Sequence, residues 1–365
     1  MGFAFSGILE TDARRFGFVR KLSPTLAHSS ADPFVPPALM LSLNLRPGAY
    51  LQGTAVEKNG KSPEVTGVDS INGLSPAAWK AVTEFSRLEV ISPDETLQLE
   101  GRGSNPAMRV VELFCPIGKG QRALIVSPPK AGKTMLLQQL AHAISTLNPG
   151  VDLLVLLIDE RPEEVTDMRR SITGEVFASS SDTERGNQVR LAQLVLDYAR
   201  RKVEVGKDAV ILLDSLTRLG RAFNIHQKSS GRTLSGGVDI RALEIPKRIF
   251  GAARRIEHGG SLTIIATALI ETNSRMDELI FQEFKGTGNM ELVLDRDLAN
   301  ERIFPAINLA ASGTRREELL FGPAVGEHQK LRRSVARMSP KDAMLNVLKL
   351  IDQYPTNDLL LAKLS

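Results

Sequence analysis

The sequence predicts an α/β fold in which a small β-barrel precedes a parallel, doubly wound sheet. The sheet is predicted because near-continuous apolar runs, each followed by polar residues, alternate with segments of helical periodicity. The barrel is predicted because short apolar stretches separated by Gly, Pro, Asn and Asp fill the first part of the chain. The predicted buried strands are 123–126, 152–159, 209–213 and 262–269, and the predicted helices between the last three are 187–205 and 241–257.

Length and composition fit about two globular domains. The chain has 365 residues, of which 42% are hydrophobic and 24% charged, enough apolar material for a substantial core. We expect a barrel domain at 1–75, a linker at 76–105 and an α/β domain at 106–365. The net charge of +4 permits a nucleic-acid partner without requiring one, so a local basic surface would have to bind it.

A single cysteine, Cys115, excludes an intramolecular disulfide and fits a reducing compartment. Because it lies in an apolar stretch, we expect it to be buried rather than reactive. The longest apolar run, 153–158, is too short to cross a bilayer, and no signal-peptide pattern is found. We therefore expect a cytoplasmic protein.

The barrel and the linker after it are predicted from short segments. Trp79, in the mixed sequence of the linker, is expected to pack at the domain junction rather than to act in function. The predicted barrel strands are 5–9, 16–20, 33–35, 50–56 and 65–71.

The second predicted strand carries a candidate surface for nucleic acid. Strand alternation places Phe16 and Phe18 on one face, and Arg15, Arg20 and Lys21 flank them. Two exposed aromatic rings beside cations would stack unpaired bases. The alternative is that both phenylalanines belong to the barrel core, where this residue type is usually found.

This part of the chain resembles a cold-shock-like OB fold, whose F-G-F strand binds single-stranded nucleic acid. The resemblance implies that Phe34 is a third aromatic residue of the same surface.

The α/β domain begins with a strand, a loop rich in Pro and Gly, and a helix that starts near Lys133. A triphosphate requires converging backbone N–H groups, a flexible cation and a hydroxyl that holds magnesium. Residues 130–134 would form the turn, Lys133 would supply the cation and Thr134 the hydroxyl. Ser127 stands where the G-x-x-x-x-G-K-[ST] pattern has its first glycine and is small enough for the turn. The alternative is an ordinary turn before an amphipathic helix.

Carboxylates follow two of the predicted buried strands, at the sheet edge where open α/β sheets bind ligands. Asp214 is expected to hold the magnesium shell beside Thr134. Glu160 is expected to orient and deprotonate the attacking water. The alternative is that strand ends carry acidic residues because they are solvated.

A ring that hydrolyses nucleotide also needs a positive charge from a neighbouring subunit at the transition state. The polar segment 312–317 follows the last core strand, and Arg315 is the candidate, with Arg316 as a competitor. The alternative is that both are solubilising surface arginines.

Together these residues resemble the transcription termination factor Rho family, over about residues 5 to 340. The resemblance implies a RecA-like P-loop ATPase core and a homohexamer that binds ATP, Mg²⁺ and single-stranded RNA. It also implies RNA-dependent ATP hydrolysis, 5'-3' RNA/DNA helicase activity, and action on the RNA polymerase elongation complex. The matching stretches are 128–134, 158–166, 213–218, 235–239, 284–289 and 312–315.

The resemblance also implies roles for individual residues. Glu160 would be the catalytic base, Lys133 a further catalytic residue and Arg315 the finger supplied in trans, while Arg302 would be a second arginine in trans. Phe304 and Met135 would contact the adenine. The ATP-binding set is Pro129, Lys130, Ala131, Gly132, Lys133, Thr134, Met135, Arg161, Asp214, Arg218, Arg302 and Phe304, with Thr134 and Asp214 at the metal. The loops that grip RNA in the central hole would contain Arg232, Thr233 and Gly236 in one and Lys285 and Gly286 in the other.

Three functions fit this pattern. The first is an RNA-translocating ATPase that binds nascent RNA and terminates transcription. The second is an RNA-binding ring ATPase that uses ATP for assembly without translocation. The third is a rotary or recombinase-like ATPase, but the F-G-F barrel argues against it, because such a motor does not need that module.

Overall fold

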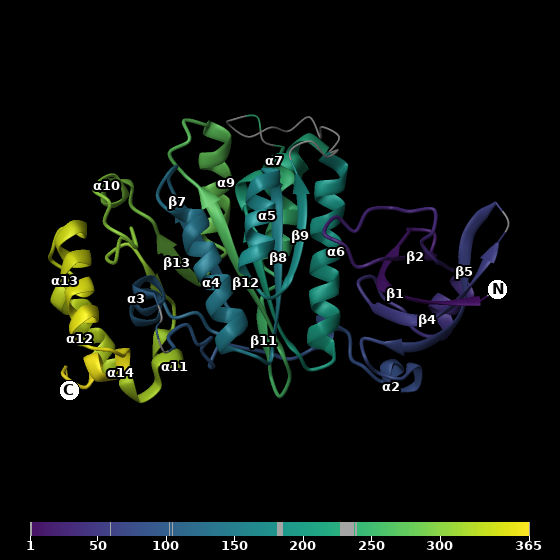
Figure 1. Cartoon of the computed structure of the whole chain (residues 1–365), viewed down its shortest axis with the longest axis horizontal. Coiled ribbons are helices and arrows are strands. Elements are labelled where there is room, and N and C mark those ends of the chain that lie inside the picture. Colours follow the sequence, from purple (N-terminus) through teal and green to yellow (C-terminus); the bar gives the residue numbers. More distant parts are fainter. Residues whose placement is uncertain are drawn as a thin grey trace.

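The computed structural model describes residues 2–58, 60–101, 103, 105–180, 185–226, 237 and 239–364. A barrel lies at one end of the elongated molecule, a group of C-terminal helices lies at the other, and an α/β sheet lies between them (Figure 1). No helix in these described ranges is long and apolar enough to span a membrane.

The β-barrel that the sequence predicts is present, and its strands close in the order β1-β2-β3-β5-β4. Its inward residues, among them Leu9, Val19 and Leu51, form a separate buried cluster. Its strands are β1 (Gly2–Thr11), β2 (Gly17–Arg20), β3 (Phe34–Val35), β4 (Tyr50–Lys58) and β5 (Lys61–Ile71), with helix α1 (Pro37–Ser42) between β3 and β4.

The linker packs on both neighbouring units. Trp79, on helix α2 (Pro76–Lys80), is fully buried in the barrel cluster and donates its indole N–H to the carbonyl of Asn44 at 3.1 Å. The expected burial of Trp79 is therefore confirmed, but the cluster in which it packs is that of the barrel. A 3-10 turn (Phe85–Arg87) follows, and then β6 (Val90–Ile91) pairs with β11 (Arg254–Ile256) of the large sheet.

The large sheet has the strand order β14-β13-β7-β12-β10-β8-β9. The strands from β13 to β9 in this order are parallel, whereas β14 and β11 run antiparallel to their neighbours. These strands are β7 (Arg122–Ser127), β8 (Val151–Glu160), β9 (Glu175–Ser180), β10 (Asp208–Asp214), β12 (Ser261–Leu269), β13 (Met290–Val293) and β14 (Gly313–Thr314).

Helices cover both faces of this sheet, which is the doubly wound arrangement that the sequence predicts. The helices that follow the strands are α4 (Lys133–Leu147), α5 (Pro162–Ser171), α6 (Arg185–Glu204), α7 (Leu216–His226), α8 (Glu244–Phe250) and α9 (Arg275–Lys285). The remaining helices are α3 (Pro106–Phe114), α10 (Arg296–Asn300), α11 (Glu317–Phe321), α12 (Val325–Val335), α13 (Pro340–Gln353) and α14 (Asn357–Leu361).

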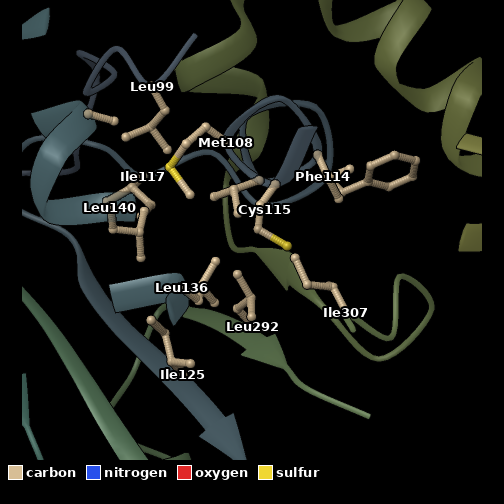
Figure 2. Close-up of a cluster of buried hydrophobic side chains, with 14 of the residues drawn as sticks. Leu99, Met108, Phe114, Cys115, Ile117, Ile125, Leu136, Leu140, Leu292 and Ile307 are labelled. Atoms are coloured by element: carbon tan, nitrogen blue, oxygen red, sulfur yellow. The ribbon is translucent and has the colours of Figure 1, made fainter. Parts of the chain in front are cut away.

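One core cluster fills the space between the sheet, α3, α4 and the C-terminal helices, and a second lies under α6 to α9. Figure 2 shows the first cluster, in which Cys115 points among Leu292, Ile307 and other apolar side chains. Burial raises the pKa of the Cys115 thiol to about 12. The cysteine is therefore buried, as expected, and poorly ionised at neutral pH.

The helix predicted for 241–257 is wrong in its second half. A 3-10 turn (Ile240–Leu243) leads into α8, which ends at Phe250, and 254–256 form β11 instead. Gly251 caps the helix, and Arg254 pairs with Leu262 in the antiparallel ladder to β12. The backbone pairing with β12 decides the structure here, because a short mixed segment fits either periodicity.

Candidate functional site

The loop between β7 and α4 has the form expected of a phosphate-binding turn. Lys130 and Gly132 adopt positive φ angles of 64° and 89°, and the helix begins at Lys133. The first N–H groups of a helix lack intrahelical partners and attract anions. Ser127 is the last residue of β7, and its hydroxyl donates to the Pro128 carbonyl at 2.9 Å. Because the backbone of Ser127 does not adopt a positive φ angle, this position does not require glycine.

Lys133 reaches the predicted carboxylates. Its Nζ lies 2.5 Å and 2.6 Å from the two carboxylate oxygens of Asp214 and 3.5 Å from Oε1 of Glu160. The Thr267 hydroxyl donates to Oδ1 of Asp214 at 2.8 Å. The structure thus brings together three residues that lie far apart in the sequence. Thr267 is a neighbour that the sequence analysis missed, because nothing distinguishes a threonine inside an apolar strand.

Glu160 has an environment that suits proton transfer. Only 2% of its side chain is exposed, and burial together with the negative charge of Asp214 raises its pKa to about 7. The positive charges of Lys133 and Arg218 oppose this rise. Arg218 Nε lies 3.3 Å from Oε1 of Glu160, and its Nη1 lies 3.3 Å from Oδ2 of Asp159. A general base works best when its pKa is near the working pH.

A pocket of about 530 Å³ opens beside the loop. Met135 and Phe304 line it although 60% and 48% of their surfaces are exposed. A Cβ added to Gly132 would lie 3.4 Å from the Phe304 ring, so the ring sits directly against the loop. An apolar pocket with a few polar groups fits a planar base. Asn105 and Gln139 also line it, and the sequence analysis missed both.

The side chains beside the phosphate loop fit a magnesium ion that binds jointly to the protein and to the phosphates of a nucleotide. In the described parts of the chain, no three His, Cys, Asp or Glu side chains are arranged as a metal site by themselves. Mg²⁺ in nucleotide sites keeps water and phosphate ligands and takes only one or two protein oxygens. Thr134, in the first turn of α4, and Asp214, at the end of β10, are oxygen donors of that kind.

The predicted arginines lie in different places. Arg161 is exposed at the N-terminus of α5, directly after β8, and Arg302 is exposed just before Phe304. Both are therefore on the loops around the carboxyl ends of the strands. The remaining members of the predicted ATP-binding set, Pro129 and Ala131, belong to the loop itself.

Arg315 lies at the other end of the parallel strands, near their amino ends. It follows β14, whose Thr314 pairs with Met290 at the start of β13, and its N–H donates to the Asn289 carbonyl at 2.9 Å. Its charge helps to lower the pKa of Arg122, whose burial has the larger effect, so it lies near the start of β7. The phosphate loop follows the end of that strand, roughly 17 Å away at the usual strand rise.

Arg316, the competitor, has partners within its own chain. Its guanidinium contacts Oε1 of Glu318 at 3.5 Å and the Ser92 hydroxyl at 3.1 Å. For the Arg315 side chain we find no hydrogen bond or ion pair to the residues that the structure describes. Arg315 is therefore the more available of the two.

On the barrel, three phenylalanines form one aromatic platform, which we define as Phe16, Phe18 and Phe34. The ring centroids lie 5.9 Å, 5.5 Å and 5.6 Å apart, and all three side chains are half-buried. Val19, next to Phe18, points into the barrel core. The alternative in which Phe16 and Phe18 fill that core is therefore wrong.

Arg20 does not face solvent beside this platform as its sequence position suggests. It is buried, and its guanidinium carbon lies 5.1 Å from the centre of the Phe18 ring. It pairs with Oε2 of Glu10 at 2.5 Å and with Oδ2 of Asp32 at 2.7 Å. Arg20 thus supports the platform from below. Neither carboxylate could be predicted as a partner from the sequence, because strand pairing, not local spacing, brings them to Arg20.

One of the two predicted RNA-gripping loops lies within the described residues. Arg232, Thr233 and Gly236 lie outside the described residues. Lys285 and Gly286 are exposed at the end of α9, and the Lys285 ammonium lies 5.7 Å from the Phe281 ring.

Comparisons with known proteins match both parts of the chain. Residues 5–77 match the RNA-binding domain of the Rho termination factor. Residues 107–314 match the nucleotide-binding domain of the ATP synthase alpha/beta family.

Many relatives carry the description transcription termination factor Rho. The one from Borreliella burgdorferi is 52% identical over 324 residues, which cover 87% of this chain and 62% of the relative. The one from Cereibacter sphaeroides is 48% identical over 359 residues, which cover 96% and 85%. The one from Pseudomonas aeruginosa is 49% identical over 360 residues, with the same two shares of 96% and 85%.

Solved structures resemble the chain in fold at low identity. An ATPase from a bacterial type III secretion system has a TM-score of 0.63 at 20% identity, with 85% of this chain and 94% of that chain covered. The assembled ATPase EscN from enteropathogenic E. coli has a TM-score of 0.60 at 20% identity, with 75% and 72% covered. At this identity the likeness shows that the fold is shared and nothing further.

Proposed function

Because the chain belongs to the transcription termination factor Rho family, we propose that it hydrolyses ATP to move along single-stranded RNA and thereby terminates transcription. The observation that carries this proposal is the presence of two sites in one chain. The barrel has an aromatic platform, and the sheet edge has the cluster of Lys133, Glu160 and Asp214.

At the sheet edge, ATP binds with its phosphates on the N–H groups of the loop and its base against Phe304 and Met135. Lys133 exchanges its contacts with Asp214 and Glu160 for the outer phosphates. Thr134 and Asp214 would hold Mg²⁺, which would neutralise charge on the phosphates. Glu160 accepts the proton of the attacking water, and Arg218 keeps its carboxylate in position.

The active unit in this proposal is a ring of identical subunits, a homohexamer. Arg315 lies too far from the phosphate loop of its own chain to reach it, yet in the described structure its side chain has no internal partner. A neighbouring subunit can bring such an arginine to the open side of a nucleotide site, where it stabilises the transition state. Arg302 is exposed near the same site and is proposed as a second arginine supplied in trans.

RNA binds in two places in this proposal. Unpaired bases stack on the aromatic platform, which binds the nascent transcript. Lys285 and Gly286, with the loop that contains Arg232, Thr233 and Gly236, grip the backbone in the central hole. The proposed target of this translocation is the elongating RNA polymerase, which is bound to the same transcript. A cytoplasmic location is also proposed.

ATP hydrolysis measured with and without single-stranded RNA, together with the oligomeric mass, tests this function. We expect RNA to stimulate hydrolysis strongly in an assembled ring. Hydrolysis that does not respond to RNA while the ring still forms would favour the alternative, in which ATP serves assembly without translocation. A monomer that is inactive with both RNA and ATP would refute both functions.

A further inference from the structure

We propose that Arg190, on helix α6 of the ATPase domain, is a positioning residue of the aromatic platform on the barrel. It acts through Glu10, which in turn holds Arg20 below Phe18. This inference depends on the proposed function in one respect, namely that the platform binds RNA.

Arg190 reaches across from α6 to three acceptors on the barrel side. Its Nη1 lies 3.0 Å from Oε2 of Glu10. Its Nη2 donates to the carbonyl oxygens of Leu26 at 2.9 Å and of Thr25 at 3.3 Å. In Figure 1, α6 is the helix of the α/β domain next to the barrel. The Arg190 guanidinium therefore links helix α6 of the ATPase domain to the barrel domain.

The same oxygen of Glu10 connects Arg190 to the platform. Oε2 of Glu10 accepts from Nε of Arg20 at 2.5 Å, and Glu10 pairs with Phe18 across the β1–β2 ladder. Arg20 in turn lies against the buried side of the Phe18 ring and pairs with Asp32. One carboxylate oxygen thus binds a cation from each unit, and the barrel's cation supports an RNA-stacking ring.

The two neighbouring guanidinium groups favour the charged form of Glu10. Only 7% of the Arg20 side chain and 18% of each of the Glu10 and Arg190 side chains are exposed. Burial works to raise the pKa of Glu10, but the hydrogen bonds and charges of Arg20 and Arg190 lower it below its usual value. His28 Nε2 lies 3.3 Å from the same oxygen, but its side chain is 60% exposed. Without Arg190, Glu10 would balance a single buried guanidinium and could turn toward solvent.

The barrel is docked firmly enough on α6 for such a contact to persist. Leu26 is buried in the α/β core, and the Ala178 N–H donates to the Pro24 carbonyl at 2.8 Å. A Cβ added to Gly48 would lie 2.2 Å from the backbone of Asp197, so the barrel lies directly on the helix. Removing the Arg190 side chain should therefore disturb the ion-pair network more than the docking.

The test measures how full-length variants bind a short oligocytidylate that occupies the platform. We expect Arg190→Ala to weaken binding about tenfold, or roughly 1.4 kcal/mol. The RNA concentration for half-maximal ATP hydrolysis should rise by the same factor, while the rate at saturating RNA stays near that of the unaltered protein. Arg200→Ala is the matched control, because Arg200 lies on the same helix but pairs with Asp197 of that helix at 3.1 Å.

A double-mutant cycle distinguishes positioning through Glu10 from a general loss of stability. If Arg190 acts through Glu10, adding Arg190→Ala to Glu10→Gln should weaken RNA binding little further. Arg190→Gln keeps a donor for the carbonyl oxygens of Thr25 and Leu26 but loses the charge. It should fold even if Arg190→Ala does not, and should still bind RNA more weakly.

Three results would overturn the inference: unaltered RNA binding in both Arg190 variants, additive effects of the Arg190 and Glu10 changes, or an equal loss in Arg200→Ala. An unaltered protein that does not bind the oligocytidylate would instead refute the proposed function.

Discussion

Glu160 shows how the site sets the chemistry of one residue. It lies at the end of a buried strand with Asp214 as a negative neighbour, while Lys133 and Arg218 are positive neighbours at 3.5 Å and 3.3 Å. Burial dominates, so the carboxyl group holds its proton up to about pH 7. A carboxylate with this pKa accepts a proton from water more readily than an ordinary glutamate does.

The first prediction concerns pH. Below about pH 7, Glu160 is protonated in the free enzyme and cannot act as a base. The value of kcat/KM for ATP hydrolysis should therefore fall about tenfold per pH unit below that point and level off above it. A pH-rate profile of the RNA-stimulated enzyme measures this. A flat profile through pH 7 would remove the raised pKa of Glu160 from the mechanism.

The stability of the fold gives an independent measure of the same pKa. Because the folded pKa is raised, the contribution of Glu160 to stability is present below the ordinary value of 4.5 and is lost as the pH rises through about 7. Glu160→Gln should remove this dependence, so thermal unfolding of the variant should change less with pH in that window.

The second prediction concerns catalysis by the same residue. Glu160→Gln keeps the size and polarity of the side chain but cannot accept the proton of water. We expect ATP to bind while hydrolysis falls about 10²- to 10⁴-fold, the usual contribution of general base catalysis. Binding of a fluorescent ATP analogue and the steady-state rate are the two measurements. Hydrolysis close to that of the unaltered protein would assign the base to another group.

At the level of elements, the barrel strands form a surface that a single strand could not. Phe18 lies on β2, Phe16 directly precedes that strand, and Phe34 begins β3, where the register pairs it with Phe18. The platform therefore depends on strand pairing as well as on the F-G-F sequence.

The third prediction tests this surface. Replacing Phe16 and Phe18 together by Ala should weaken binding of a short single-stranded RNA, since stacking contributes about 1–3 kcal/mol per base. The nucleotide site lies on another unit, so ATP affinity without RNA should not change. Leu41→Ala is the control, because Leu41 is 82% exposed on α1 of the same barrel. Equal RNA binding by the double variant and the control would contradict the assignment.

Elements with a simple pattern could be predicted from sequence, and those decided by distant contacts could not. The buried runs and barrel strands follow period and composition, and Asp214 could be placed beside the phosphate loop because both follow strands of one sheet. The strand at 254–256 and the burial of Arg20 depend on partners brought close by the fold. Arg190 meets Glu10 across 180 positions of sequence, so no local pattern indicates it.

At the level of the whole molecule, the nucleotide site lies at the carboxyl ends of the parallel strands, and Arg315 lies at their amino ends. If Arg315 serves a nucleotide site, as we propose, that site belongs to a second chain placed beside this one. Arg316 is occupied by Glu318 and Ser92, which leaves Arg315 as the arginine that could complete the site of a neighbour.

The last prediction follows from this arrangement. Arg315→Ala should bind ATP normally in isolated subunits but lose hydrolysis in the ring by about 10³-fold or more, the usual effect of an arginine finger. Arg316→Ala should remain active. The sharper test mixes Arg315→Ala with Glu160→Gln before the ring assembles. In a mixed ring, a subunit with an intact Glu160 can receive Arg315 from its neighbour, so two inactive proteins should recover part of the activity. If Arg315 acted within its own chain, each subunit would still lack one group, and every mixture would stay inactive.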